Sequence, residues 1–137
     1  MSILAPQRLR EIPLFAELSS PALESLAEIA IEVDVPAGQV LTRPDDSGMG
    51  MFVIEQGTVT VELKERVIEL GPGEFFGELA LLIPEGVRVA RVRAETDVRM
   101  LALARDDFAR LLEQEPSIAV AMLPVLARRL SNEIRAH

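Results

Sequence analysis

The spacing of apolar residues changes twice along the chain and divides it into three parts. From Pro6 to Ala30 the pattern is helical, and Ser20 followed by Pro21 predicts an N-cap and first turn. Apolar positions at i, i+3, i+4 and i+7 give this helix one buried face, formed by Leu23, Leu26, Ala27 and Ala30. Residues 31–104 alternate with period two, and residues 105–135 return to helical spacing. The predicted order is helix, barrel, helix within one domain, 1–137.

The middle part, 31–104, predicts short strands separated by turns. Its first strand alternates apolar and acidic residues from Ile31 to Val35, before the turn Pro36-Ala37-Gly38. The next strands are expected at Val40–Arg43, Met51–Glu55, Thr58–Leu63, Arg66–Leu70, Val89–Ala94 and Val98–Ala104. Lys64-Glu65 is expected to form a tight hairpin connection. Short strands punctuated by glycine are typical of a small antiparallel barrel or jelly roll.

Two helices are predicted after the barrel. Asp106 or Asp107 is expected to cap a short helix that ends at Leu112. Pro116 opens a longer helix, in which Pro124 lacks the amide of a helical residue and is expected to produce a kink. The apolar stripe of this helix has spacings of four, three, four and four and consists of Ala119, Leu123, Leu126, Leu130 and Ile134.

Composition and charge exclude several classes of function. The net charge of −8 disfavours binding to nucleic acid, because a polyanion is repelled. The chain has no Cys, and its only His is His137, which argues against zinc, haem, iron–sulfur and thiol chemistry and against a metal-dependent enzyme on this barrel. No apolar stretch approaches the roughly 20 residues of a membrane span. We therefore expect a cytoplasmic protein that is not an enzyme, needs no cofactor and does not insert into a membrane.

One segment carries the residue types of an anion site. After Phe75-Phe76, Gly77 opens a short apolar run whose consecutive amides are available to bind an anion. Arg88 can offer two donors to phosphate oxygens, whereas Glu78 is only an acceptor and suits a sugar hydroxyl. Arg91 is a weaker candidate, because its offset of three residues from Arg88 puts it on the other face of a strand. The pair of opposite charges favours a phosphorylated sugar as ligand.

These residues resemble the phosphate-binding cassette of cyclic nucleotide-binding domains. Gly77-Glu78-Leu79-Ala80-Leu81, followed by Arg88, Ala90, Val92 and Ala94, is similar to the cassette found in bacterial catabolite activator proteins, protein kinase A regulatory subunits and cyclic-nucleotide-gated channels. The blocks Ile12-Pro13-Leu14-Phe15, Pro36-Ala37-Gly38, Phe52–Gly57 and Gly71–Gly77 resemble the same family in the same order. The resemblance implies a mainly β fold with flanking helices, an eight-stranded antiparallel jelly-roll barrel of the cupin-like double-stranded β-helix type. It divides the chain into a helical entry (6–30), a barrel (31–104) with its cassette (76–94), and C-terminal helices (105–135).

The resemblance also implies a role for each site residue. Gly77, Leu79, Ala80, Arg88 and Val89 would hold the cyclic phosphate, and Glu78 would accept from the ribose 2′-hydroxyl. The base would lie against Val61, Leu70 and Phe76, under a lid formed by Leu123, Leu126 and Leu130.

The nucleotide and the mode of action follow from the same resemblance. Val89 stands where relatives that prefer cyclic GMP commonly have Ser or Thr, so cyclic AMP is the expected ligand, with cyclic GMP as the alternative. We expect a sensor module that signals by movement of its C-terminal helix, which is also a candidate contact for a homodimer.

Other interpretations stay open at this point. Val89 and the acidic Glu85 are compatible with a degenerate domain that acts as a protein-interaction scaffold without binding nucleotide, and the chain is also compatible with the sensor fragment of a longer transcription regulator. An alternative interpretation of the three lid leucines is that they pack in the core and do not cover a base. The pair Arg128-Arg129 is expected on a solvated face.

Overall fold

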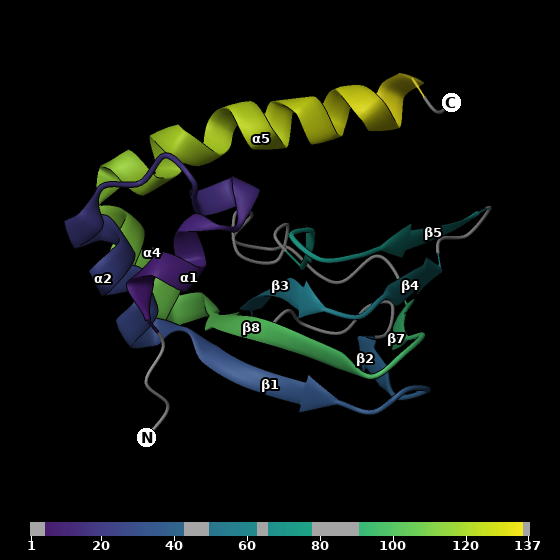
Figure 1. Cartoon of the computed structure of the whole chain (residues 1–137). Coiled ribbons are helices and arrows are strands. Elements are labelled where there is room, and N and C mark those ends of the chain that lie inside the picture. Colours follow the sequence, from purple (N-terminus) through teal and green to yellow (C-terminus); the bar gives the residue numbers. More distant parts are fainter. Residues whose placement is uncertain (1–4, 43–49, 63–65, 78–90, 136–137) are drawn as a thin grey trace.

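The computed structural model describes residues 5–42, 50–62, 66–77 and 91–135, in which the shorter helices gather at one end of two β-sheets and the long C-terminal helix runs away from that end (Figure 1). The helices are α1 (Pro6–Arg10), the 3₁₀ helix η1 (Pro13–Phe15), α2 (Ser20–Ile29), α4 (Arg105–Gln114) and α5 (Pro116–Arg135). The strands are β1 (Ile31–Val35), β2 (Val40–Thr42), β3 (Gly50–Gln56), β4 (Val59–Glu62), β5 (Val67–Leu70), β6 (Phe75–Phe76), β7 (Arg91–Ala94) and β8 (Val98–Ala104). The expected order of helix, strands and helix is the order observed.

The strands form two antiparallel four-stranded sheets, ordered β1-β8-β3-β6 and β2-β7-β4-β5. Among the described residues no strand ladder joins one sheet to the other, so these strands form two separate sheets. β4 and β5 form the expected hairpin, with Val59 opposite Leu70 and Glu62 opposite Val67. The connection predicted at Lys64-Glu65 lies outside the described residues.

Two apolar clusters lie on opposite sides of the first sheet, because successive strand residues point to opposite faces. The inner cluster joins the two sheets and contains Val35, Ile54, Val59, Leu70, Phe76, Val92, Ala94, Val98 and Met100. The outer cluster joins the same sheet to the helices and includes Met51, Val53, Phe75, Leu101, Leu103, Phe15 and Phe108. β3 and β8 are therefore covered on both faces, which explains why Val53, Ile54, Met100 and Leu101 are buried almost without alternation.

The helical entry is broken into three short helices, which the sequence pattern did not predict. Pro13 opens η1, and α2 then starts at Ser20. The N-cap of α2 is Ser19 rather than Ser20: the Ser19 Oγ accepts a hydrogen bond from the amide of Ala22 at 3.2 Å. Pro21 is then the second rather than the first helical residue, and it is still in the first turn, where the missing amide has no helical partner to lose.

The helical entry is held to the first sheet by charge as well as by apolar packing. The Arg8 guanidinium on α1 donates to Glu32 on β1 and to both carboxylate oxygens of Glu55 on β3, at 2.8 and 2.7 Å. These hydrogen bonds, first to Glu32 and then to Glu55, raise the pKa of Arg8 above its usual value. One guanidinium thus joins α1 to two strands.

The C-terminal helices correct two further details of the sequence pattern. Neither Asp106 nor Asp107 caps α4: the N-cap position is Ala104, which makes no side-chain cap, and both acids lie in the first turn, where the helix dipole favours them. α5 runs through Pro124 as one helix. Its stripe of predicted apolar positions is not its buried face, because Leu123 and Leu130 are 62% and 63% exposed. Ile118 and Met122 are buried instead.

Candidate functional site

The strand β6 leads directly into the segment that resembles a phosphate-binding cassette. Phe75 pairs with Val53 and Phe76 with Phe52 on the neighbouring strand β3. Because successive strand residues point to opposite faces of the sheet, Phe75 lies in the outer cluster and Phe76 in the inner cluster. Gly77 follows with φ of +87°, a conformation that favours glycine. The residue whose amide was predicted to approach a phosphate therefore has a backbone conformation that side-chain-bearing residues rarely adopt.

A hydrogen-bonded turn, residues 71–74, precedes β6. The amide of Gly71 donates to the Glu74 Oε2 at 2.9 Å, and the amide of Gly73 donates to the Ile54 carbonyl at 2.8 Å. Gly73 has φ of +86°, and a Cβ there would lie 3.2 Å from the Cδ of Pro13 on η1. The lead-in to the cassette is thus attached both to β3 and to the helical layer.

The three residues predicted as the wall for a base come together. Leu70 and Phe76 belong to the inner cluster, and Val61 is half-buried against it. Phe76 also stacks on Phe52, with ring centroids 5.2 Å apart and an interplanar angle of 24°. Phe52 was not among the predicted wall residues. Its position opposite Phe76 comes from the pairing of β3 with β6, which is a tertiary contact.

The structure does not describe the residues after Gly77 that are predicted to bind the phosphate and the ribose. Glu78, Leu79, Ala80, Arg88 and Val89 lie outside the described residues, so their roles stay predictions. The strand β7 does place the competing arginine: Arg91 is exposed and lies 3.8 Å from Glu62, whereas Val92 and Ala94 belong to the inner cluster. Arg91 therefore faces away from the interior, as its offset from Arg88 predicts.

The predicted lid residues on α5 do not lie together with the wall. Leu126 is half-buried against the outer cluster, on the other side of the first sheet from Val61, Leu70 and Phe76. Leu123 and Leu130 are exposed. In this position of α5 the wall and the lid are separate, and contact of the leucines with a base stays a prediction.

The sequence pattern placed Arg129 wrongly. Arg128 is exposed, as expected, but Arg129 is half-buried and its guanidinium carbon lies 4.3 Å from the centroid of the Phe75 ring. The spacing along the sequence is compatible with this position. One face of α5 is formed by residues four, three and four positions apart, namely Ile118, Met122, Val125 and Arg129. The inward face of α5 therefore ends in an arginine.

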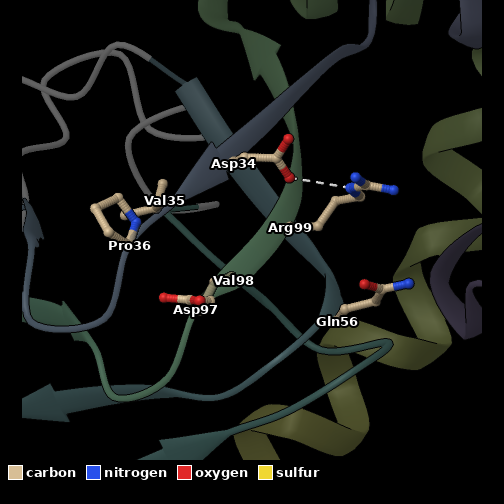
Figure 2. Close-up of a pocket in the computed structure, with 7 residues that line it drawn as sticks. All are labelled: Asp34, Val35, Pro36, Gln56, Asp97, Val98 and Arg99. Carbon is tan, nitrogen blue, oxygen red and sulfur yellow. Dashed lines mark hydrogen bonds and ion pairs between the residues drawn. The ribbon is translucent and has the colours of Figure 1, made fainter.

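A hollow lies near the turn after β1 (Figure 2). It has a volume of about 370 Å³ and is lined by Asp34, Val35, Pro36, Gln56, Asp97, Val98 and Arg99. The Arg99 Nε donates to the Asp34 Oδ1 at 3.0 Å, which raises the pKa of Arg99. The Asp97 Oδ1 accepts from the amide of Ala37 at 2.9 Å. The charges in this hollow are engaged with one another or with the backbone, and none of the predicted site residues lines it.

The described residues show neither a metal-binding cluster nor a membrane-spanning helix. They contain no group of three or more His, Cys, Asp or Glu side chains arranged to hold a metal ion. None of the helices described in the structure is long and apolar enough to cross a membrane.

Two antiparallel sheets with flanking helices define a jelly-roll class of fold, and comparison with known proteins identifies the family. The model of the cyclic nucleotide-binding domain matches residues 32–115. The chain belongs to the cyclic nucleotide-binding domain family, whose members are regulatory modules.

Individual relatives have different architectures. A cyclic nucleotide-gated potassium channel of Rhizobium etli is 41% identical over 113 residues, which are 82% of this chain and 32% of the channel. The cyclic AMP receptor protein of Thermus thermophilus is 37% identical over 101 residues, 69% of this chain and 46% of that protein. A solved structure from a study of a cyclic-GMP-dependent signalling pathway in bacterial phytopathogenesis is 35% identical, with a TM-score of 0.72, and the match covers 84% of this chain and 95% of that one. The chain thus spans less than half the length of the two curated relatives.

Proposed function

We propose that this chain binds a 3′,5′-cyclic nucleotide without chemical change and acts as a sensor in the cytoplasm. The observation that carries the proposal is the junction of Phe76 and Gly77. Phe76 is the last residue of β6 and belongs to the inner apolar cluster. Gly77, the next residue, has a positive φ at the start of the cassette-like segment. An apolar wall next to a glycine-led run of amides suits a ligand with a flat base at one end and a phosphate at the other.

The two charged residues of the site are proposed to bind different parts of the ligand, Arg88 the phosphate and Glu78 the ribose. We propose that Arg88 donates two hydrogen bonds to the cyclic phosphate, with the amides of Gly77, Leu79, Ala80 and Val89 around it. Glu78 accepts from the ribose 2′-hydroxyl, since a carboxylate has only acceptors to offer. The base stacks against the wall of Val61, Leu70 and Phe76.

The choice of nucleotide depends on Val89. A valine offers no side-chain hydrogen bond to guanine, so cyclic AMP is the preferred ligand and cyclic GMP the weaker one. The relatives include proteins described with each of the two nucleotides, so the argument for cyclic AMP depends on this side chain.

Titration calorimetry with both nucleotides tests the function. The wild type is expected to bind cyclic AMP more tightly than cyclic GMP, and the melting temperature rises with ligand concentration because only the folded chain binds. In Val89→Thr the affinity for cyclic GMP is expected to rise about tenfold, the equivalent of one added hydrogen bond, with the affinity for cyclic AMP little changed. Val67→Thr is the matched control, because Val67 is exposed on β5, outside the proposed site.

The alternative outcome identifies a scaffold. If neither nucleotide gives heat or a shift in melting temperature at millimolar concentration, the domain does not sense nucleotide. Tighter binding of cyclic GMP than of cyclic AMP by the wild type would contradict the assignment of Val89.

We also propose that α5 transmits the signal and pairs with a second copy of the chain. Val120, Leu123 and Leu130 are exposed, and with Ala127 they follow spacings of three, four and three. This is the a/d repeat of a coiled coil, and a stripe of this kind matches its own copy in a twofold pair. Movement of α5 by the ligand requires contacts that differ between its two positions, which is the role proposed for Leu123, Leu126 and Leu130.

A charged residue introduced into this stripe of α5 tests whether two copies of the chain pair. Sedimentation velocity is expected to show a dimer of the wild type at micromolar concentration and a monomer of Leu123→Glu, since a buried carboxylate pair opposes association. Arg128→Glu, on the same helix but off the stripe, is expected to leave the dimer intact. A wild type that sediments as a monomer at all concentrations would refute the pairing without affecting nucleotide binding.

A further inference from the structure

One side chain connects α5 to the strand that enters the cassette. The guanidinium of Arg129 lies over the ring of Phe75, 4.3 Å from its centroid, and the Arg129 Nη1 is shielded from solvent. A cation over an aromatic face is attracted by the ring's quadrupole, and the attraction is stronger where water is excluded. The contact joins two parts of the chain that are 54 residues apart (129 − 75).

Phe75 is placed to pass a displacement on to the cassette. It is 5% exposed and packs in the outer cluster with the helices. The next residue, Phe76, stacks on Phe52 in the inner cluster, and Gly77 follows directly. β6 is only two residues long, so Phe75, Phe76 and Gly77 are consecutive, and a displacement of the Phe75 backbone is passed directly to Phe76 and Gly77.

We propose that Arg129 is a positioning residue for nucleotide binding, which acts through Phe75 and not by contact with the ligand. By holding Phe75, Arg129 fixes the start of the cassette in the conformation that Gly77 needs, and preorganisation of this kind raises affinity. The same contact holds the inward face of α5 against β6, so nucleotide affinity and the position of α5 are coupled through one pair of side chains. This inference depends on the proposed function, since it concerns the affinity of the same site.

Arg129→Met tests the contact, because methionine keeps the apolar packing and removes the charge. The affinity for cyclic AMP, measured by calorimetry, is expected to fall between about three- and thirtyfold, the range of a single cation–π contact. Arg129→Lys keeps a cation near the ring and is expected to restore part of the loss. Arg128→Met is the matched control: it removes the neighbouring exposed charge and is expected to change the affinity by less than about twofold.

A double-mutant cycle separates action through Phe75 from action on the ligand. Phe75→Leu removes the aromatic face but keeps an apolar side chain, and it is expected to weaken binding as Arg129→Met does. The double variant is then expected to have the same affinity for cyclic AMP as whichever single variant binds it more weakly, because both changes break the same contact. Effects that multiply in the double variant would overturn the proposal, since Arg129 would then act independently of Phe75.

Hydrogen exchange gives a second readout that needs no nucleotide. In Arg129→Met the amides in the last two turns of α5 are expected to exchange faster than in the wild type and in Arg128→Met. Unchanged nucleotide affinity and unchanged exchange in Arg129→Met would overturn the inference while the proposed function stands. A wild type that does not bind nucleotide, with faster exchange in Arg129→Met, would refute the proposed function and the coupling but leave the anchor of α5 in place.

Discussion

Arg88→Ala is expected to weaken cyclic AMP binding about 100-fold. The phosphate carries the only formal charge of the ligand, and the proposed site lies next to an apolar cluster where water does not replace a lost partner well. Loss of one member of a hydrogen-bonded charge pair in such a place costs about 3 kcal/mol. Calorimetry with the purified variant measures the loss, and the variant is expected to melt at the temperature of the wild type in the absence of ligand.

Arg91→Ala is the control for this experiment. Arg91 belongs to the same stretch of sequence, but it is exposed on the outer face of β7 beside Glu62. Its removal is expected to change nucleotide affinity by less than about twofold, because an exposed pair contributes little. If Arg91→Ala abolished binding and Arg88→Ala did not, the two arginines would have exchanged roles and the assignment of the phosphate partner would be wrong.

Phe108→Ala is expected to lower the free energy of unfolding by about 3–5 kcal/mol, as is usual for loss of a buried phenylalanine ring. Phe108 is 1% exposed in α4 and belongs to the cluster that joins the helices to the first sheet. A loss of that size is a large part of the total stability of a typical domain. Urea denaturation followed by circular dichroism measures it.

Two further variants make this result interpretable. Phe108→Leu keeps most of the apolar volume and is expected to remain folded where the alanine variant is too unstable to measure. Val67→Ala also shortens an apolar side chain, but Val67 is 64% exposed, so the expected loss is less than about 1 kcal/mol. Equal losses in Phe108→Ala and Val67→Ala would contradict the existence of a second core between the helices and the sheet.

Most of the elements were predictable because the fold uses local signals. The alternation in Ile31–Val35 and the turn at Gly38 correspond to β1 and to a glycine with φ of +92°. The long helix was predicted to start at Pro116, and it does. β6 was missed, since two residues are too few to show a period. The cap of α2 was misplaced by one residue, since Ser19 and Ser20 are the same residue type and only the hydrogen bond to Ala22 distinguishes them.

For the candidate site, the sequence and the structure contribute different parts. The segment from Gly77 to Val89 was singled out by its residue types and by its resemblance to the family's cassette. Its role in phosphate binding stays a prediction, because the residues after Gly77 lie outside the described part of the chain. Val61, Leu70 and Phe76 were predicted to lie together and they do, whereas the stacking of Phe52 on Phe76 was not predicted; contact of these side chains with a base stays a prediction. The face of α5 was predicted wrongly: two apolar stripes are available on this helix, and the chain buries the one with Ile118 and Met122.

By itself, the sequence determined the order of helices and strands, the alternation that separates inner from outer positions, and the presence of a cassette-like segment. These properties depend on neighbours within a few residues, where backbone sterics and periodicity decide. Tertiary structure alone decided that Phe75 and Phe76 face different clusters, that Arg8 joins α1 to two strands, and that Arg129 lies on Phe75 rather than in solvent. Each of these depends on which element packs opposite, because the free energy of burying a ring or pairing a guanidinium is set by a partner far away in the chain.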